Sequence, residues 1–217
     1  MSAYVAVLGR VLSKCAAVIA LAGAMASLAT AAPAGGTFRA TGDLTFARNA
    51  GAATLLEDGS VVVFGPSFDG DRYSAATGTF VATGSIHAPR FAAHAFALPD
   101  GSVLVIGGTT SELRGERYDP ATNTWGWSAP MSMARAHAQA TQLLDGRILV
   151  AGGRTASGAV ATAEIYNPAT GSFASVPPMP QARADGIAET LLDGHVLIAG
   201  GVDAGGYYLK CSVLFDP

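Results

Sequence analysis

The sequence predicts an all-β fold built from four copies of one antiparallel unit, and three observations lead to this prediction. Asp-Gly pairs recur at 58–59, 100–101, 145–146 and 193–194, in step with a longer repeated pattern. Each pair suits a tight hairpin turn, because glycine adopts positive φ without a steric penalty. After residue 35, no apolar pattern with the helical period of about 3.6 residues competes with short strands.

Four elements recur in the same order in each copy. An arginine lies ten residues before each Asp-Gly pair, at Arg48, Arg90, Arg135 and Arg183. The apolar segment after the pair ends in two glycines in three copies, at Gly107-Gly108, Gly152-Gly153 and Gly200-Gly201. An aromatic residue follows at Tyr73, Tyr118, Tyr166 and Phe215, and a second one lies ten residues before each arginine, at Phe38, Phe80, Trp125 and Phe173. This spacing predicts four strands per copy, with copies at approximately 43–82, 83–127, 128–175 and 176–217.

The repeat resembles the kelch motif in its bacterial, galactose-oxidase-like form. The copies GSVLVIGG and RYDPATNTW, and GRILVAGG and IYNPATGSF, carry the resemblance, which extends over residues 33–217. The first copy departs from it, with Pro66 in place of the second glycine and Ser74-Ala75 in place of Asp-Pro. The resemblance implies a β-propeller in which each copy is one four-stranded blade, either as a closed small ring or as a partial propeller.

The distribution of side-chain size independently suits blades that converge on an axis. Five residues before each Asp of the turn, on the predicted inner strands, stand Ala53, Ala95, Ala140 and Ala188, whereas the outer strands carry the aromatic residues. Propeller blades pack face to face and splay apart outwards, so small inner and large outer residues are expected. Burial of both blade faces also accounts for a charged fraction of only 13 %.

Residues 1–31 have the pattern of a cleaved signal peptide, followed by a kelch domain over 32–217. Arg10 and Lys14 precede an Ala-rich apolar run, and Ala29-Thr30-Ala31 suits a signal-peptidase site. A secreted or periplasmic location is therefore expected, with an uncleaved anchor as the alternative. The mature chain keeps 11 basic and 16 acidic residues, a net charge of −5, and Cys211 is its single cysteine.

The two ends of the predicted domain carry complementary parts of one repeat. The last copy reaches Phe215-Asp216-Pro217, and residues 33–38 resume the same pattern up to its aromatic residue. Residues 36–42 are therefore expected to supply the outer strand of the last or a missing blade, which would protect two sheet edges. An open fragment of a larger propeller and a ring formed by a homodimer are the alternatives.

Composition excludes several classes of partner. A net charge of −3 and a pI near 5.7 argue against binding of nucleic acid through a basic face. The apolar fraction of 50 % comes with one long apolar stretch, in the leader, so no membrane association beyond export is expected.

The repeated arginines are interpreted as structural. Asp71, Glu116 and Glu164 each stand two residues before a repeat tyrosine, where a carboxylate can pair with a partly buried arginine. The fourth copy has Val213 at this position, so the pairing cannot be uniform.

Repetition marks what the fold requires, and positions that diverge between copies are where function can lie. The divergent polar residues of the inner strands are Thr54, His94, His137, Gln139, Thr141, Asp185 and Glu189. From this set we predict a binding site formed by His94, His137, Gln139, Asp185 and Glu189. The loops after the glycine segments also vary, at 66–72, 109–115, 154–163 and 202–212, and are expected to form one rim.

We predict no catalytic residue, no metal ligand and no cofactor. Two histidines out of register are a weak metal signal, and the Tyr207, Tyr208 and Cys211 set lacks the histidines of a copper-radical site. The sequence therefore favours an exported module that binds a protein or a glycan through its rim loops and channel mouth. The alternatives are a carbohydrate-active oxidase or hydrolase, and a truncated relative of a larger kelch protein without function of its own.

Overall fold

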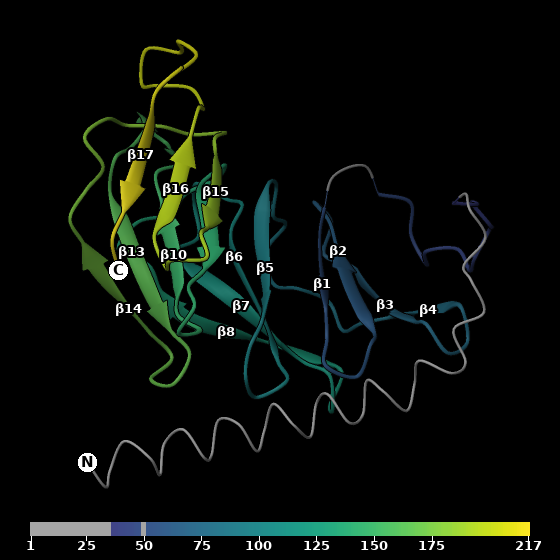
Figure 1. Cartoon of the computed structure of the whole chain (residues 1–217). Helices are drawn as coiled ribbons and strands as arrows, with labels where there is room; N and C mark the ends of the chain where they lie inside the picture. Colours follow the sequence, from purple (N-terminus) through teal and green to yellow (C-terminus); the bar gives the residue numbers. More distant parts are fainter. Residues whose placement is uncertain (1–35, 49–50) are drawn as a thin grey trace, which may run out of the picture. The chain divides into compact units, whose positions relative to one another are not determined.

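The computed structural model describes residues 36–48 and 51–217, and their regular secondary structure consists of 17 β-strands without a helix (Figure 1). The chain divides into two units, Met1–Ala40 and Thr41–Pro217. In the first unit, residues 36–40 form no strand, and the predicted signal peptide lies outside the described residues. The all-β prediction is confirmed.

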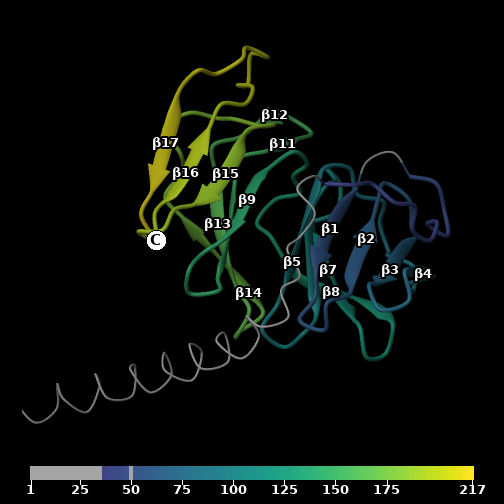
Figure 2. The ribbon, with the colours of Figure 1, turned by 45° about the vertical axis from the view of Figure 1, so that its right-hand side comes forward.

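Four antiparallel sheets follow one another along the second unit, one for each predicted repeat (Figures 1 and 2). Sheet 1 consists of β1 (Ala52–Leu55), β2 (Val61–Phe64), β3 (Gly70–Ser74) and β4 (Thr79–Ala82). Sheet 2 consists of β5 (Ala93–Ala97), β6 (Val103–Gly107), β7 (Arg114–Asp119) and β8 (Thr124–Pro130). Sheet 3 consists of β9 (Gln139–Gln142), β10 (Ile148–Ala151), β13 (Ala163–Asn167) and β14 (Ser172–Val176). Sheet 4 consists of β15 (Ile187–Thr190), β16 (Val196–Ala199) and β17 (Ser212–Phe215).

One further hairpin interrupts the third repeat. It consists of β11 (Arg154–Thr155) and β12 (Gly158–Ala159), and it lies in the chain between β10 and β13. The sequence predicts a variable loop at residues 154–163, because strands of two residues leave no detectable pattern.

The Asp-Gly pairs form the predicted turns between the first two strands of each sheet. In sheet 2, Gly101 has φ of +82° and its N–H donates to the Leu98 carbonyl over 2.9 Å. Asp100 accepts a hydrogen bond from the backbone N–H of Ser102 over 3.1 Å, which closes the turn from its other side. The turn thus fixes the register of β5 and β6 through local chemistry alone.

Three hydrophobic clusters lie between successive sheets. The alternation of side chains along each second strand divides that strand between two clusters. On β6, Val103 and Val105 pack toward sheet 1, whereas Leu104 and Ile106 pack toward sheet 3. Likewise on β10, alternate residues join the clusters on either side of sheet 3. Sheets 2 and 3 are therefore buried on both faces, as expected for blades.

Three of the four repeat arginines pair with the carboxylate that the spacing predicts. Arg90 lies 3.1 Å from Glu116 and Arg135 lies 2.8 Å from Glu164, while Arg48 forms an ion pair with Asp71. Arg90 and Arg135 are fully buried, and burial lowers the pKa of both against the opposing effect of the glutamates. These three arginines are scaffold elements that tie the start of a repeat to its third strand.

Sheet 4 contains three strands, and no described residue forms a fourth. The segment that begins at Thr41 contacts the turn between β3 and β4, where Gly42 donates to the Gly78 carbonyl over 2.8 Å. Gly84, which follows β4, makes the equivalent bond to Asn123 of the next sheet over 3.2 Å. Gly42 therefore occupies the place of a residue that follows an outer strand. Supply of that strand by residues 36–42 and closure of the ring stay predictions.

Candidate functional site

A left-handed backbone conformation recurs two residues after the repeat arginine. Ala92, His137 and Asp185 have φ of 52°, 54° and 58°. Aspartate and histidine tolerate this conformation better than most residues, and it interrupts an extended strand. His137 and Asp185 therefore lie two residues before β9 and β15, and their predicted location on the inner strands is wrong for this reason.

The two displaced residues meet each other across successive repeats. His137 Nδ1 lies 2.6 Å from Asp185 Oδ1, and the Asp185 backbone N–H donates to the His137 carbonyl over 3.0 Å. Arg154 of β11 reaches the second carboxylate oxygen of Asp185 over 3.3 Å. Asp185 thus contacts His137 through one carboxylate oxygen and Arg154 through the other. We call His137, Arg154 and Asp185 the rim triad.

The rim triad is accessible to a partner. Its three side chains are 41 %, 39 % and 37 % exposed, respectively. The Asp185 carboxylate holds both a guanidinium and an imidazole in place, which reduces the freedom that these side chains lose on binding. The arrangement therefore offers preorganised donors on an open surface.

Two exposed tyrosines belong to the same end of the sheets. In the loop between β16 and β17, Val202 exchanges backbone hydrogen bonds with Ala184 over 2.8 and 2.9 Å. This contact anchors the loop beside Asp185. Tyr207 and Tyr208 of the loop are 74 % and 91 % exposed. Figure 2 shows this loop and the β11–β12 hairpin at one end of sheets 3 and 4.

The remaining predicted residues lie near the rim triad or along the inner strands. Gln139 is buried at the start of β9, where its amide can donate to the Ala151 carbonyl over 3.0 Å and accept from the Gly186 N–H over 3.1 Å. Glu189 is exposed on β15, farther along the strand. Thr141 pairs with Thr190 of β15 over 3.2 Å. Gln139 thus supports the backbone beside Asp185, whereas no contact joins Glu189 to the rim triad in the described part of the chain.

His94 bridges sheets 2 and 3 through its backbone contact. Its Nε2 lies 2.8 Å from the Ala138 carbonyl, which requires a hydrogen on Nε2. Burial lowers the pKa of His94, and the hydrogen bond to Ala138 opposes this effect in part. His94 therefore belongs to the contact between the sheets, at the residue that follows His137 in the chain.

The lowered pKa of His94 predicts a loss of stability in acid. Between the lowered folded pKa and the unfolded value of about 6.5, the unfolded chain binds more protons, so stability falls as pH decreases below about 6.5. In His94→Gln, which keeps a donor for Ala138, we expect a smaller loss between about pH 7.5 and about pH 5. Urea unfolding of both proteins at the two pH values measures the difference, and equal losses would contradict the assignment.

Arg154 is the member of the rim triad that sequence reasoning missed as a binding residue. It lies in a variable loop, and only its position in the predicted rim indicated a role. Its backbone pairs with Ala136, one residue before His137, through hydrogen bonds of 2.7 and 2.9 Å. The signal that could have identified it is a charged residue directly after Gly152-Gly153, where the loop begins.

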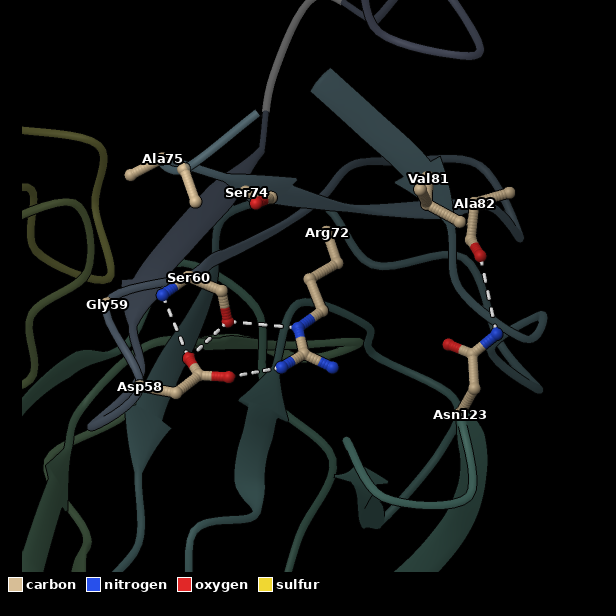
Figure 3. Close-up of a pocket in the computed structure, with 10 residues that line it drawn as sticks. Asp58, Gly59, Ser60, Arg72, Ser74, Ala75, Val81, Ala82 and Asn123 are labelled. Atoms are coloured by element: carbon tan, nitrogen blue, oxygen red, sulfur yellow. Dashed lines mark hydrogen bonds and ion pairs between the residues drawn. The ribbon is translucent and has the colours of Figure 1, made fainter. Parts of the chain in front are cut away.

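A second candidate is a cavity of about 480 Å³ between sheets 1 and 2 (Figure 3). Arg72 forms an ion pair with Asp58, and its Nε donates to Ser60 Oγ over 2.9 Å. Hydrogen bonds from Ser60 lower the pKa of Asp58, with a further contribution from Arg72. Asn123 lies on the opposite side and donates to the Ala82 carbonyl over 3.4 Å.

The same polar set recurs in sheet 2, which favours a structural role for it. There, Arg117 donates to Ser102 Oγ over 2.7 Å and pairs with Asp100. The set occurs at equivalent positions in the first two sheets, which favours a role in their turns, whereas the rim triad occurs once in the described residues. The rim triad is therefore the stronger candidate site.

Two findings apply to the described residues, 36–48 and 51–217. No group of three or more histidine, cysteine, aspartate or glutamate side chains in them is arranged to hold a metal ion. They also contain no helix with the length and apolar character needed to cross a membrane.

A comparison with models of protein families identifies the third repeat. Residues 137–180 match the model of the Kelch motif. The match begins at His137 of the rim triad and covers the whole of sheet 3, from β9 to β14. A comparison with curated proteins found no significant match. The matched residues carry a Kelch motif, and the repeated antiparallel sheets around it have the architecture of kelch blades.

Proposed function

We propose that the protein is a β-propeller interaction module that binds a protein partner at the rim of sheets 3 and 4. The observation that carries the proposal is the juxtaposition of the rim triad with the loop of Tyr207 and Tyr208. Arginine and tyrosine are enriched among the residues that dominate protein interfaces. The surface combines them with a histidine and an aspartate that hold fixed positions.

The chemistry of this surface favours a folded or extended protein over a small molecule. Small ligands are usually bound in concave pockets that bury most of their surface. The rim triad is open instead, and the tyrosines extend from it on a loop. A partner with a carboxylate for Arg154 and apolar surface for the tyrosines fits this arrangement best.

We also propose that the protein is exported. The leader pattern of residues 1–31 supports cleavage after Ala31 and a secreted or periplasmic location, where the rim would meet its partner.

Site-specific photo-crosslinking in the producing cells tests the rim. With p-benzoylphenylalanine at position 208, we expect a discrete covalent adduct with one protein. At position 170, an exposed turn residue at the other end of β13, we expect none. The additional substitution Arg154→Ala should abolish the adduct, because loss of a central interface arginine costs about 2 kcal/mol or more.

Arg147→Ala is the matched control, since Arg147 is an arginine in the turn before β10 and pairs with Asp145 over 2.6 Å. It should leave the adduct intact. Equal adducts at positions 208 and 170, or an adduct that survives Arg154→Ala, would exclude the rim as the binding surface.

A further inference from the structure

Sheet 4 contains a buried arginine that lacks the carboxylate of its counterparts. Arg183 is fully buried, like Arg90 and Arg135. Val213 occupies the position of the repeat carboxylate, and it pairs with Ile198 as Glu164 pairs with Val150. Within the described residues, no carboxylate lies within ion-pair distance of Arg183. Its charge is therefore left without the compensation that the other repeats provide.

The guanidinium is directed at a cysteine instead. Arg183 Nη1 donates to the carbonyls of Gly200 and Cys211 over 3.1 and 3.2 Å, and Nη2 lies 3.5 Å from Cys211 Sγ. Arg183 Nε has no hydrogen-bond partner among the described residues, as is also the case for Arg48 Nε and Arg135 Nε. In the third repeat, Thr162 stands in the place of Cys211, and Arg135 Nη2 donates both to its hydroxyl and to Glu164. The Cys211 sulfur is thus the side-chain group that Arg183 contacts where the other arginines contact a carboxylate.

Cys211 is also open to reagents. The residue is exposed and has no disulfide partner in the described part of the chain, and its Sγ lies 3.6 Å from Gln181 Oε1. Reactive cysteines are partly exposed and lie beside positive charge, because the thiolate is the nucleophile. The surroundings of Cys211 meet both conditions.

We propose that Cys211 is a site of reversible thiol–disulfide exchange, at which the Arg183 guanidinium stabilises the thiolate and small disulfides are the substrates. The thiol first releases its proton to solvent. The thiolate then attacks one sulfur of the disulfide, a new S–S bond to Cys211 forms, and the original S–S bond breaks. The second sulfur leaves as a thiolate, so Cys211 is oxidised and the leaving half of the reagent is reduced.

Restoring the missing carboxylate tests the role of Arg183. In Val213→Glu, a glutamate takes the position of Glu116 and Glu164 and competes with the sulfur for the guanidinium. Val213→Gln is the matched control, because it has the same shape without the charge. The protein is treated near neutral pH with 2-hydroxyethyl disulfide, which is uncharged, and the adduct at Cys211 is followed by peptide mass spectrometry.

We expect adduct formation at Cys211 to slow about fivefold or more in Val213→Glu relative to Val213→Gln, since a neighbouring opposite charge strongly favours the ionised form of a group. Equal rates at Cys211 in the two variants would overturn the proposal.

A second variant keeps the test decisive if the substitution at position 213 disturbs sheet 4. Gln181→Glu places a carboxylate at an exposed position beside the same sulfur. Repulsion of the thiolate and attraction of Arg183 should both slow the reaction. A rate equal to that of the unchanged protein would again overturn the role assigned to the charge at Cys211.

Discussion

Replacement of Glu164 by alanine is expected to lower the free energy of unfolding by about 3–5 kcal/mol, the typical cost of removing one partner of a buried ion pair. Arg135 is fully buried and Glu164 nearly so, with Nη2 and Oε1 2.8 Å apart. The backbone N–H and the hydroxyl of Ser132 donate to the same carboxylate, each over 2.8 Å. The substitution therefore leaves a charge and two further donors without their acceptor.

Urea unfolding of the two proteins measures this loss. Glu189→Ala is the control, because Glu189 is an exposed glutamate on β15 of the next sheet. Its loss should change stability by no more than about 0.5 kcal/mol. Similar effects of the two substitutions would show that the buried pair does not hold the third repeat together.

The fold was largely predictable because its determinants are local and repeated. Each Asp-Gly turn specifies a hairpin through its own chemistry. Arg135 and Glu164 occupy the same positions relative to the turn and the repeat tyrosine as Arg90 and Glu116. The β11–β12 hairpin was not predictable, since it occurs in one repeat and its two strands are too short for a pattern. The left-handed conformation at Ala92 was equally hidden, because alanine has no preference for it.

The candidate site was predictable in composition but not in geometry. Divergence between copies selected His137 and Asp185, which the structure brings into direct contact. Their contact depends on how sheet 4 packs against sheet 3, which is a tertiary property that no local pattern encodes. Arg154 joins them from a loop whose length varies between repeats. Cys211 was noted as a lone cysteine, and only its contact with Arg183 gives it a chemical role.

Gly152→Ala is expected to destabilise the protein by about 3 kcal/mol or more, because strain in the backbone adds to an overpacked contact between sheets 3 and 4. Gly152 has φ of +64°, and a Cβ there would meet the Arg183 carbonyl oxygen well inside van der Waals contact. That oxygen also accepts a hydrogen bond from the Gly153 N–H over 2.8 Å, so it cannot move freely.

Gly146→Ala separates the two effects, since Gly146 has φ of +86° with open space around its Cβ position. It should lose only the backbone contribution, about 1–2 kcal/mol. Thermal and urea unfolding of both variants measure the difference, and equal losses would mean that the close approach of Gly152 to Arg183 does not constrain the packing of the two sheets.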